Sequence, residues 1–189
     1  MVTVYFVRHA EPVHGYKDDR TRPLSDSGMV DRRIVLDYLK DKAIDAFYCS
    51  PYKRSMDTIA EAAEFFNMEI ITDERFRERE VGEQGGGIEM IRRRWADFDY
   101  HEIGGESLRM VQRRNIEALF DVLDKNDNKN IVIGTHGSAL STILNYFDPS
   151  FDCDAFLRIM EWTPYIICVR FDGHAAADKF ECAYISKAL

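Results

Sequence analysis

Val2-Thr3-Val4-Tyr5-Phe6-Val7, followed at once by Arg8 and His9, is the stretch of sequence that decides the fold. Its six residues are almost continuously apolar or β-branched, which is typical of a strand buried on both faces. A second run of this kind, Asn130-Ile131-Val132-Ile133-Gly134, is followed two residues later by His136. Two buried strands that each lead into a histidine predict an α/β sheet with polar chemistry at one edge.

Shorter strand and helix patterns alternate along the rest of the chain. Strands are predicted over 45–49 and 69–72, and an antiparallel pair over 165–171 and 180–185. Apolar residues three and four apart predict helices after Ser25, after a Ser50 N-cap with Pro51 as first helical residue, over 106–124 and after Gly137. This alternation predicts a three-layer α/β/α fold with a mainly parallel sheet of about six strands.

The chain contains no repeat, low-complexity tract or linker, so we expect residues 1–189 to form one domain. The least regular stretch is 83–106, which includes Gly85-Gly86-Gly87 and Arg92-Arg93-Arg94. We expect this stretch to form a lid over the site. The arginine run is typical of a solvated helix face, and a contact for an anionic substrate tail is the alternative.

Composition excludes several classes of partner. A net charge of −8 argues against nucleic acid or an anionic membrane as the main partner. No apolar run approaches the ~20 residues of a membrane span, and the amino terminus lacks the features of a signal peptide. Four unpaired cysteines indicate reduced thiols and a cytoplasmic location. The helix faces are compatible with a monomer or a homodimer.

Residues at the ends of the predicted strands suit the transfer of a phosphoryl group. A neutral histidine can attack a phosphate monoester and hold the phosphoryl group covalently. Arg8 and Arg54 would keep a nearby imidazole unprotonated and would offer planar donor forks to phosphate oxygens. His136 directly precedes a predicted helix start, where an anion is favoured. His9 and His136 therefore stand in a setting that suits this chemistry, while His14, His101 and His174 are expected to be ordinary surface residues.

The leaving oxygen needs a proton, which a carboxylate can supply before it activates water for the second step. Glu78, in the run Arg77-Glu78-Arg79-Glu80, is the first choice for this role. Glu74, Glu80 and Glu83 are neighbouring alternatives, and a solvated surface strand is the other interpretation of the run. Candidates for a rim that contacts the substrate are Arg20, Arg22, Arg79 and Ser107.

Two other kinds of site fit the sequence less well. The adjacent arginines oppose a metal cation, and no short ligand spacing such as His-Glu-x-x-His is present. No Gly-x-Gly-x-x-Gly follows the first strand, which argues against a dinucleotide. We therefore expect neither a metal nor a cofactor.

Four segments, taken in chain order, resemble the motifs of the histidine phosphatase superfamily, also called the phosphoglycerate mutase-like family. They are Arg8-His9-Ala10-Glu11, Ser50-Pro51 with Arg54, Glu78 four residues before Gly82, and His136-Gly137. The resemblance covers essentially the whole chain and extends to Leu24–Gly28 and Gly105–Ser107. It implies that His9 is the nucleophile and Glu78 the proton donor. It also implies that Arg8 and Arg54 bind the phosphate, and that His136 is both catalytic and phosphate-binding.

Departures from the family pattern favour a phosphatase over a mutase. Ala10 replaces the usual glycine, and Gln84-Gly85-Gly86-Gly87 stands where Trp-Glu-Gly often follows the donor. The chain is also shorter than cofactor-dependent mutases and lacks the polar residues that follow their first motif. The resemblance thus implies a metal-independent phosphatase for a small phosphorylated metabolite. A phosphoglycerate-type mutase and a non-catalytic, phosphate-binding regulatory protein are the alternatives.

Overall fold

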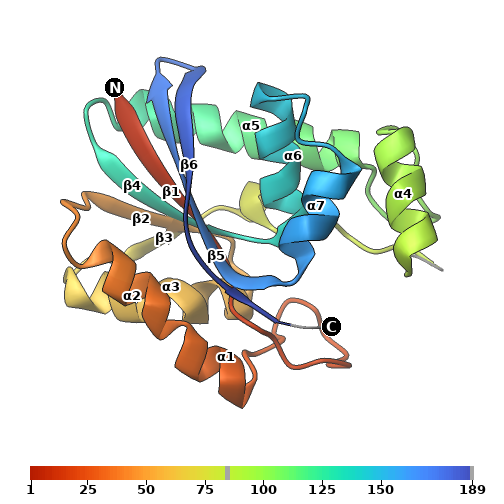
Figure 1. Cartoon of the computed structure of the whole chain (residues 1–189), viewed down its shortest axis with the longest axis horizontal. Helices are drawn as coiled ribbons and strands as arrows, with labels where there is room; N and C mark the ends of the chain where they lie inside the picture. Colours follow the sequence, from red (N-terminus) through yellow and green to blue (C-terminus); the bar gives the residue numbers. More distant parts are fainter. Residues whose placement is uncertain (84–85, 188–189) are drawn as a thin grey trace.

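The computed structural model describes residues 1–83 and 86–187, and a six-stranded sheet in the order β3-β2-β4-β1-β5-β6 runs through its centre (Figure 1). The strands are β1 (Val2–Arg8), β2 (Ala46–Cys49), β3 (Ile70–Thr72), β4 (Asn130–Thr135), β5 (Trp162–Asp172) and β6 (Ala175–Ser186). Strands β3, β2, β4 and β1 pair in parallel, while β5 runs antiparallel to both β1 and β6. The predicted mainly parallel sheet, with a closing antiparallel pair, is confirmed.

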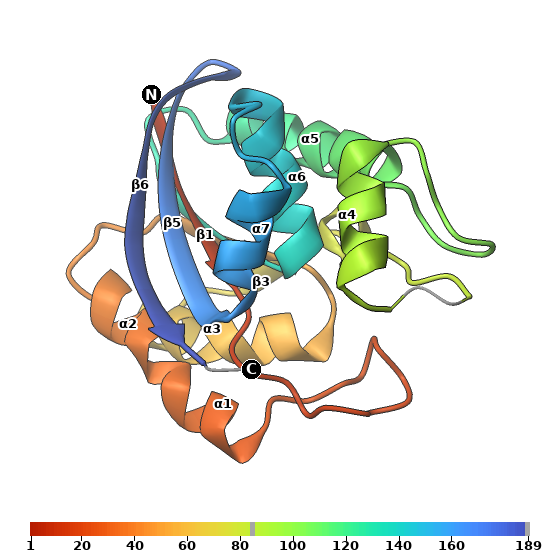
Figure 2. The same cartoon turned by 45° about the vertical axis from the view of Figure 1, so that its right-hand side comes forward.

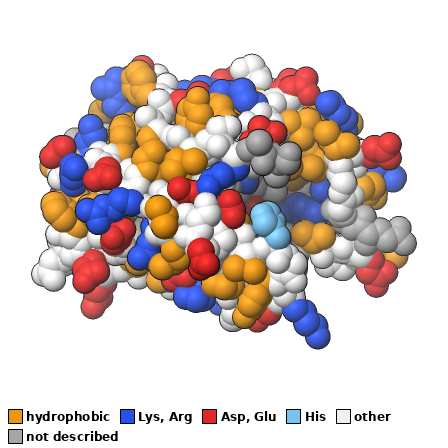
Figure 3. All heavy atoms as spheres, turned by 60° about the horizontal axis from the view of Figure 1, so that its bottom comes forward, with side chains coloured by type: hydrophobic (Ala, Val, Ile, Leu, Met, Phe, Trp, Pro, Cys, Tyr) orange, Lys and Arg blue, Asp and Glu red, His pale blue; other side chains and the backbone are white. Residues whose placement is uncertain are grey.

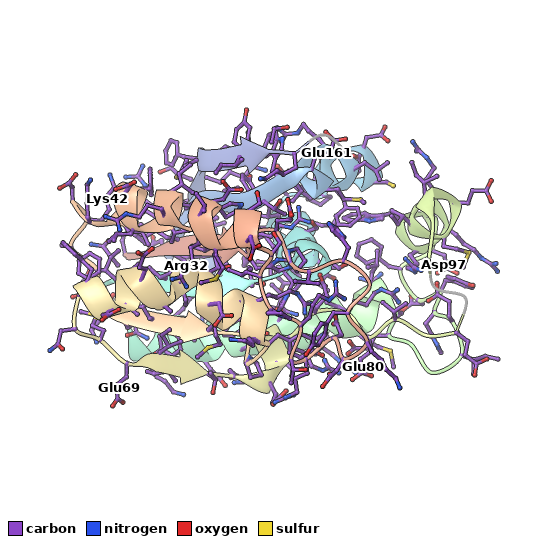
Figure 4. All side chains as sticks on the ribbon, turned by 90° about the horizontal axis from the view of Figure 1, so that it is seen from below. Arg32, Lys42, Glu69, Glu80, Asp97 and Glu161 are labelled. Carbon is purple, nitrogen blue, oxygen red and sulfur yellow. The ribbon has the colours of Figure 1, made fainter. Side chains whose placement is uncertain are left out.

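Helices cover both faces of the sheet, as a three-layer α/β/α fold requires. On one face lie α1 (Asp26–Asp31), α2 (Arg33–Leu39) and α3 (Lys53–Phe65); on the other lie α5 (Leu108–Lys125), α6 (Gly137–Phe147) and α7 (Cys153–Met160) (Figure 1). A further helix, α4 (Ile88–Ala96), packs beside α7 and away from α1–α3 (Figures 2 and 4). None of the helices described is both long and apolar enough to cross a membrane.

Alternation along β1 explains why it lies at the centre. Val4 and Phe6 join the core under α5, α6 and α7, whereas Tyr5 and Val7 join the core under α2 and α3. The strand is therefore apolar on both faces. Its register with β4 pairs Arg8 with Thr135, so the residues that follow each strand emerge side by side at one edge of the sheet.

Two helix starts differ from the sequence prediction. The predicted cap at Ser50 and helical start at Pro51 are wrong, because α3 begins at Lys53 after the N-cap Tyr52. The Ser50 hydroxyl accepts the Tyr52 N–H at 3.2 Å within a turn, so Pro51 lies before the helix. Arg54 nevertheless falls in the first helical turn, as predicted.

The other helix whose start differs is α5, which begins at Leu108 rather than at 106. Ser107 is its N-cap, and the Ser107 hydroxyl accepts the N–H of Met110 at 3.2 Å. The expected irregular stretch 83–106 contains α4, a helix of nine residues. Within it, Arg92 and Arg93 are exposed, as expected, but Arg94 is buried. Gln84 and Gly85, which belong to the glycine-rich departure from the family pattern, lie outside the described residues.

Candidate active site

One cavity of about 320 Å³ gathers most of the residues that the sequence singles out. Arg8, His9, Arg54 and Glu78 all line it, at the carboxyl ends of the parallel strands. The His9 N–H donates to the Thr135 carbonyl at 3.1 Å, which fastens the end of β1 to the end of β4. The sheet edge therefore brings together the first, second and third predicted motifs.

The loop that carries the nucleophile candidate is fixed from both sides. The Ala10 N–H donates to the Thr58 hydroxyl of α3 at 2.9 Å. The Ser25 N–H donates to the Glu11 carbonyl at 2.9 Å, and a Cβ on Gly28 would lie 2.1 Å from that same carbonyl oxygen. Only a glycine at this position lets α1 approach the loop so closely. The resemblance of Leu24–Gly28 to a recurring family segment thus has a structural counterpart.

Hydrogen bonds to both ring nitrogens set the tautomer of His9. Its Nδ1 lies 2.7 Å from the Ala10 carbonyl oxygen, and since a carbonyl only accepts, Nδ1 carries the hydrogen. Its Nε2 accepts from the Nε of Arg54 at 3.2 Å. In the neutral ring, Nε2 therefore holds the lone pair that a nucleophile needs.

The surroundings of His9 favour its neutral form. Burial is the main cause that holds its pKa well below the usual value, followed by the positive charges of Arg54 and Arg8. Burial also lowers the pKa of Arg8 to about 10, so this guanidinium stays charged near neutral pH. The site thus combines an uncharged imidazole with two charged guanidinium groups.

We expect the His9 ring in the wild-type protein to bind no proton as pH falls through about 6.5, the ordinary pKa of histidine. Replacing Arg54 with glutamine removes a positive neighbour and should raise the pKa of His9. Arg22→Gln should raise it less, because Arg22 is the weakest of the charges that lower this pKa. Nuclear magnetic resonance of the histidine ring protons, assigned with His9→Ala, measures these shifts. A wild-type His9 that titrates at about pH 6.5 or above contradicts the expectation.

Arg54 and Arg8 are held by the protein backbone. The guanidinium of the buried Arg54 donates to the Asp19 carbonyl at 2.6 Å and to the Asp19 carboxylate at 3.2 Å. One nitrogen of Arg8 donates to the carbonyls of Ile159 and Trp162, at the passage from α7 into β5. Each guanidinium is thus oriented before any anion binds, which lowers the entropic cost of binding phosphate.

The Glu78 carboxylate lies against the start of α6. One of its oxygens accepts the N–H groups of Arg79 at 2.8 Å and Ala139 at 3.3 Å, and the other accepts the N–H of Ser138 at 3.1 Å. Two of these donors belong to the first turn of the helix, whose positive end favours a carboxylate. The side chain is therefore held at the cavity by backbone groups.

The three alternative carboxylates have other positions. Glu74 pairs with Arg20, Glu80 pairs with Arg77, and Glu83 lines a different cavity. The structure therefore brings Glu78, rather than these neighbours, to the wall that His9 shares.

His136 lies behind His9, inside the protein. It is fully buried and is absent from the described residues that line the cavity. Its ring lies edge-on to His9, with the ring centres 5.2 Å apart, and its Nε2 lies 2.7 Å from the Ser50 hydroxyl. Burial and the charge of Arg54 hold its pKa well below the usual value, so this second imidazole is also neutral.

Two of the four predicted rim residues line the cavity, and two do not. Arg22 and Arg79 line the cavity, but Arg20 points to Glu74 at the surface and Ser107 is buried as a helix cap. Sequence reasoning missed part of the wall, namely Glu11, Pro12, His14, Asp19, Val81, Met160, Glu161, Thr163 and Lys187.

Acidic and basic side chains are interspersed over the face that Figure 3 shows. No group of three or more His, Cys, Asp or Glu side chains in the described part of the chain is placed to hold a metal ion.

The family model described as the histidine phosphatase superfamily (branch 1) matches residues 4–176. The chain belongs to this superfamily. Phosphoserine phosphatase 1 of Hydrogenobacter thermophilus is 32% identical over 151 residues, which cover 72% of this chain and 71% of the relative. Phosphoglycerate mutase-like protein 4 of Arabidopsis thaliana is 28% identical, over 78% of this chain and 71% of the relative.

Solved structures of other proteins share the fold. YhfR of Bacillus stearothermophilus superposes with a TM-score of 0.78 and 22% identity, covering 100% of this chain and 98% of that one. A phosphoserine phosphatase variant from Entamoeba histolytica, in complex with phosphoserine, superposes with a TM-score of 0.76 and 18% identity, covering 97% and 96% of the two chains. The three-layer architecture is therefore shared with both of these proteins over nearly their whole length.

Proposed function

We propose that this chain is a metal-independent phosphatase that hydrolyses a small phosphate monoester through a phosphohistidine on His9. The observation that carries the proposal is the state of His9: a neutral ring with Nδ1–H bonded to Ala10, and with Nε2 beside the charged Arg54. An unprotonated ring nitrogen next to a guanidinium fork is what attack on a phosphate requires.

In the first step, a phosphate oxygen replaces His9 Nε2 as the acceptor for Arg54, and the freed lone pair attacks phosphorus. An N–P bond forms while the P–O bond to the organic group breaks. The leaving oxygen takes a proton from the carboxyl group of Glu78, which lines the same cavity. Arg8 and Arg54 stabilise the charge on the transferring oxygens.

In the second step, water attacks the phosphorus of phosphohistidine and gives its proton to the Glu78 carboxylate. The N–P bond breaks, inorganic phosphate leaves, and His9 recovers its lone pair. His136 packs against His9 and lies within hydrogen-bond distance of Ser50. It positions the His9 ring, and its influence on the phosphoryl group passes through His9. In this mechanism, guanidinium groups supply the positive charge that a metal ion provides in other phosphatases.

The relatives support a phosphatase more directly than a mutase. Two of the proteins compared above are named phosphoserine phosphatases, and one is named phosphoglycerate mutase-like. A mutase must retain the phosphoryl group until an acceptor hydroxyl arrives, whereas a phosphatase admits water.

Phosphate release from a panel of phosphorylated metabolites tests the proposal. We expect release that continues in the presence of a chelator, is blocked by vanadate, and passes through an acid-labile phosphoenzyme. Loss of activity on chelation contradicts metal independence. Transfer to an added alcohol or phosphoglycerate, with little free phosphate, would instead identify a mutase.

A further inference from the structure

A second cavity, of about 290 Å³, adjoins the first on the side of the proton donor. The two cavities share three wall residues, Glu78, Arg79 and Val81. In the proposed reaction, Glu78 protonates the oxygen of the departing alcohol. The second cavity therefore begins where the organic part of the substrate leaves the phosphate.

Apolar side chains from three helices form much of the wall of this second cavity. They are Ile91 and Trp95 from α4, Leu108 from α5 and Phe156 from α7. The rings of Trp95 and Phe156 pack together, with centres 5.7 Å apart. At the junction, Val81 is 66% exposed, and an apolar ligand that covered it would remove this surface from water.

The two basic residues in the same wall are engaged within the protein. Arg79 donates to the Glu102 carboxylate at 3.2 Å and to the Glu106 carbonyl at 2.9 Å. Arg94 donates to the other oxygen of Glu102 at 2.8 Å, and all three ionic side chains are buried. This ion-paired group stiffens the wall between α4 and the donor loop. A carboxylate or ammonium of a substrate would have to break it or lose its own hydration.

We propose that the second cavity receives the leaving group, and that the preferred substrates are phosphate monoesters of apolar alcohols rather than of amino acids or glycerate. This inference rests on the proposed function, because it takes Glu78 as the donor to the leaving oxygen. The residues 86–106, with α4 at their centre, then form a selective wall. Its apolar side chains distinguish one organic group from another, while Arg8 and Arg54 bind the phosphate common to all of them.

Binding to a His9→Ala protein tests the cavity without turnover. Calorimetry should show that hexyl phosphate binds about tenfold or more tightly than ethyl phosphate, since four more methylenes are buried. It should also bind more tightly than phosphoserine, whose carboxylate and ammonium would lose hydration in the cavity. Adding Val81→Asn should remove most of this preference. Val30→Asn is the matched control, because Val30 is 73% exposed on α1 and absent from the residues that line either cavity. Equal affinities for the three esters, or no effect of Val81→Asn, would overturn the inference.

Turnover supplies the second measurement. The ratio of kcat/KM for hexyl phosphate to that for ethyl phosphate compares leaving oxygens of similar basicity. Ile91→Asn should lower this ratio about tenfold, whereas Ile88→Asn, an exposed position on the same helix, should leave it unchanged. Hydrolysis with no preference between the two esters overturns the inference about the leaving group but agrees with the proposed phosphatase function. If no ester is hydrolysed, the proposed function fails, and the binding experiment still decides whether the cavity selects apolar esters.

Discussion

His9→Ala is expected to lower kcat for phosphate release by about 10⁴-fold or more, with no phosphoenzyme detectable. The reason is that alanine cannot form the N–P bond, and water would have to attack the ester directly at a site built for a ring nitrogen. His136, the other imidazole close by, is fully buried behind His9 and is absent from the described wall of the cavity. It is therefore not placed to take over the attack.

The same substitution should leave phosphate binding measurable. Arg8 is held by the carbonyls of Ile159 and Trp162, and Arg54 keeps its hydrogen bonds to Asp19 when the bond to His9 is lost. We expect the loss to fall on kcat rather than on affinity, which is the signature of a group that acts in the reaction itself. Calorimetry with inorganic phosphate measures the affinity, and single-turnover assays measure the chemical step.

His101→Ala is the matched control, because His101 is exposed and lines a different cavity. Its activity should stay within about twofold of the wild type. His9→Asn keeps more of the buried volume, so it separates loss of the nucleophile from loss of packing against His136. A phosphoenzyme that still forms in either His9 variant would show that another residue is the nucleophile.

The residues that could be found from the sequence share one property: they follow a strong local pattern. Arg8 and His9 come directly after an apolar strand that is buried on both faces, and parallel pairing of β1 with β4 carries His136 to the same edge. Arg54 was also found, although its helix begins later than predicted. Although the N-cap is Tyr52 rather than Ser50, two residues later than predicted, Arg54 still lies in the first helical turn.

The residues that could not be found are placed by tertiary contacts. Asp19 reaches Arg54 from a loop without a motif, and Lys187 reaches the cavity from the end of β6, far away along the chain. Arg94 differs from Arg92 and Arg93 because successive side chains of α4 point about 100° apart around the helix, so that Arg94 faces Glu102 while the other two are exposed. Composition cannot show which member of a charged run is buried, since the choice depends on what the helix packs against.

Glu78→Gln is expected to lower kcat for an alkyl phosphate by about 10²- to 10⁴-fold, because the alkoxide then leaves without a proton. With 4-nitrophenyl phosphate the first step should be far less affected, since nitrophenolate is a stable anion. The second step still lacks its base. Rapid mixing should therefore show a burst of about one equivalent of nitrophenolate per site, followed by slow turnover and accumulated phosphohistidine.

Glu80→Gln is the matched control for this experiment. Glu80 lies two residues further on, is exposed, and pairs with Arg77. It should keep near-normal kcat for both esters and show no burst. In Glu78→Gln, the amide NH2 group could face the N–H groups of α6 that donate to the Glu78 carboxylate, and two donors repel each other. Glu78→Ala avoids this repulsion and serves as a second variant with the same expected burst. Equal losses on alkyl and nitrophenyl esters, without accumulated phosphohistidine, would show that Glu78 supports binding and is not the proton donor.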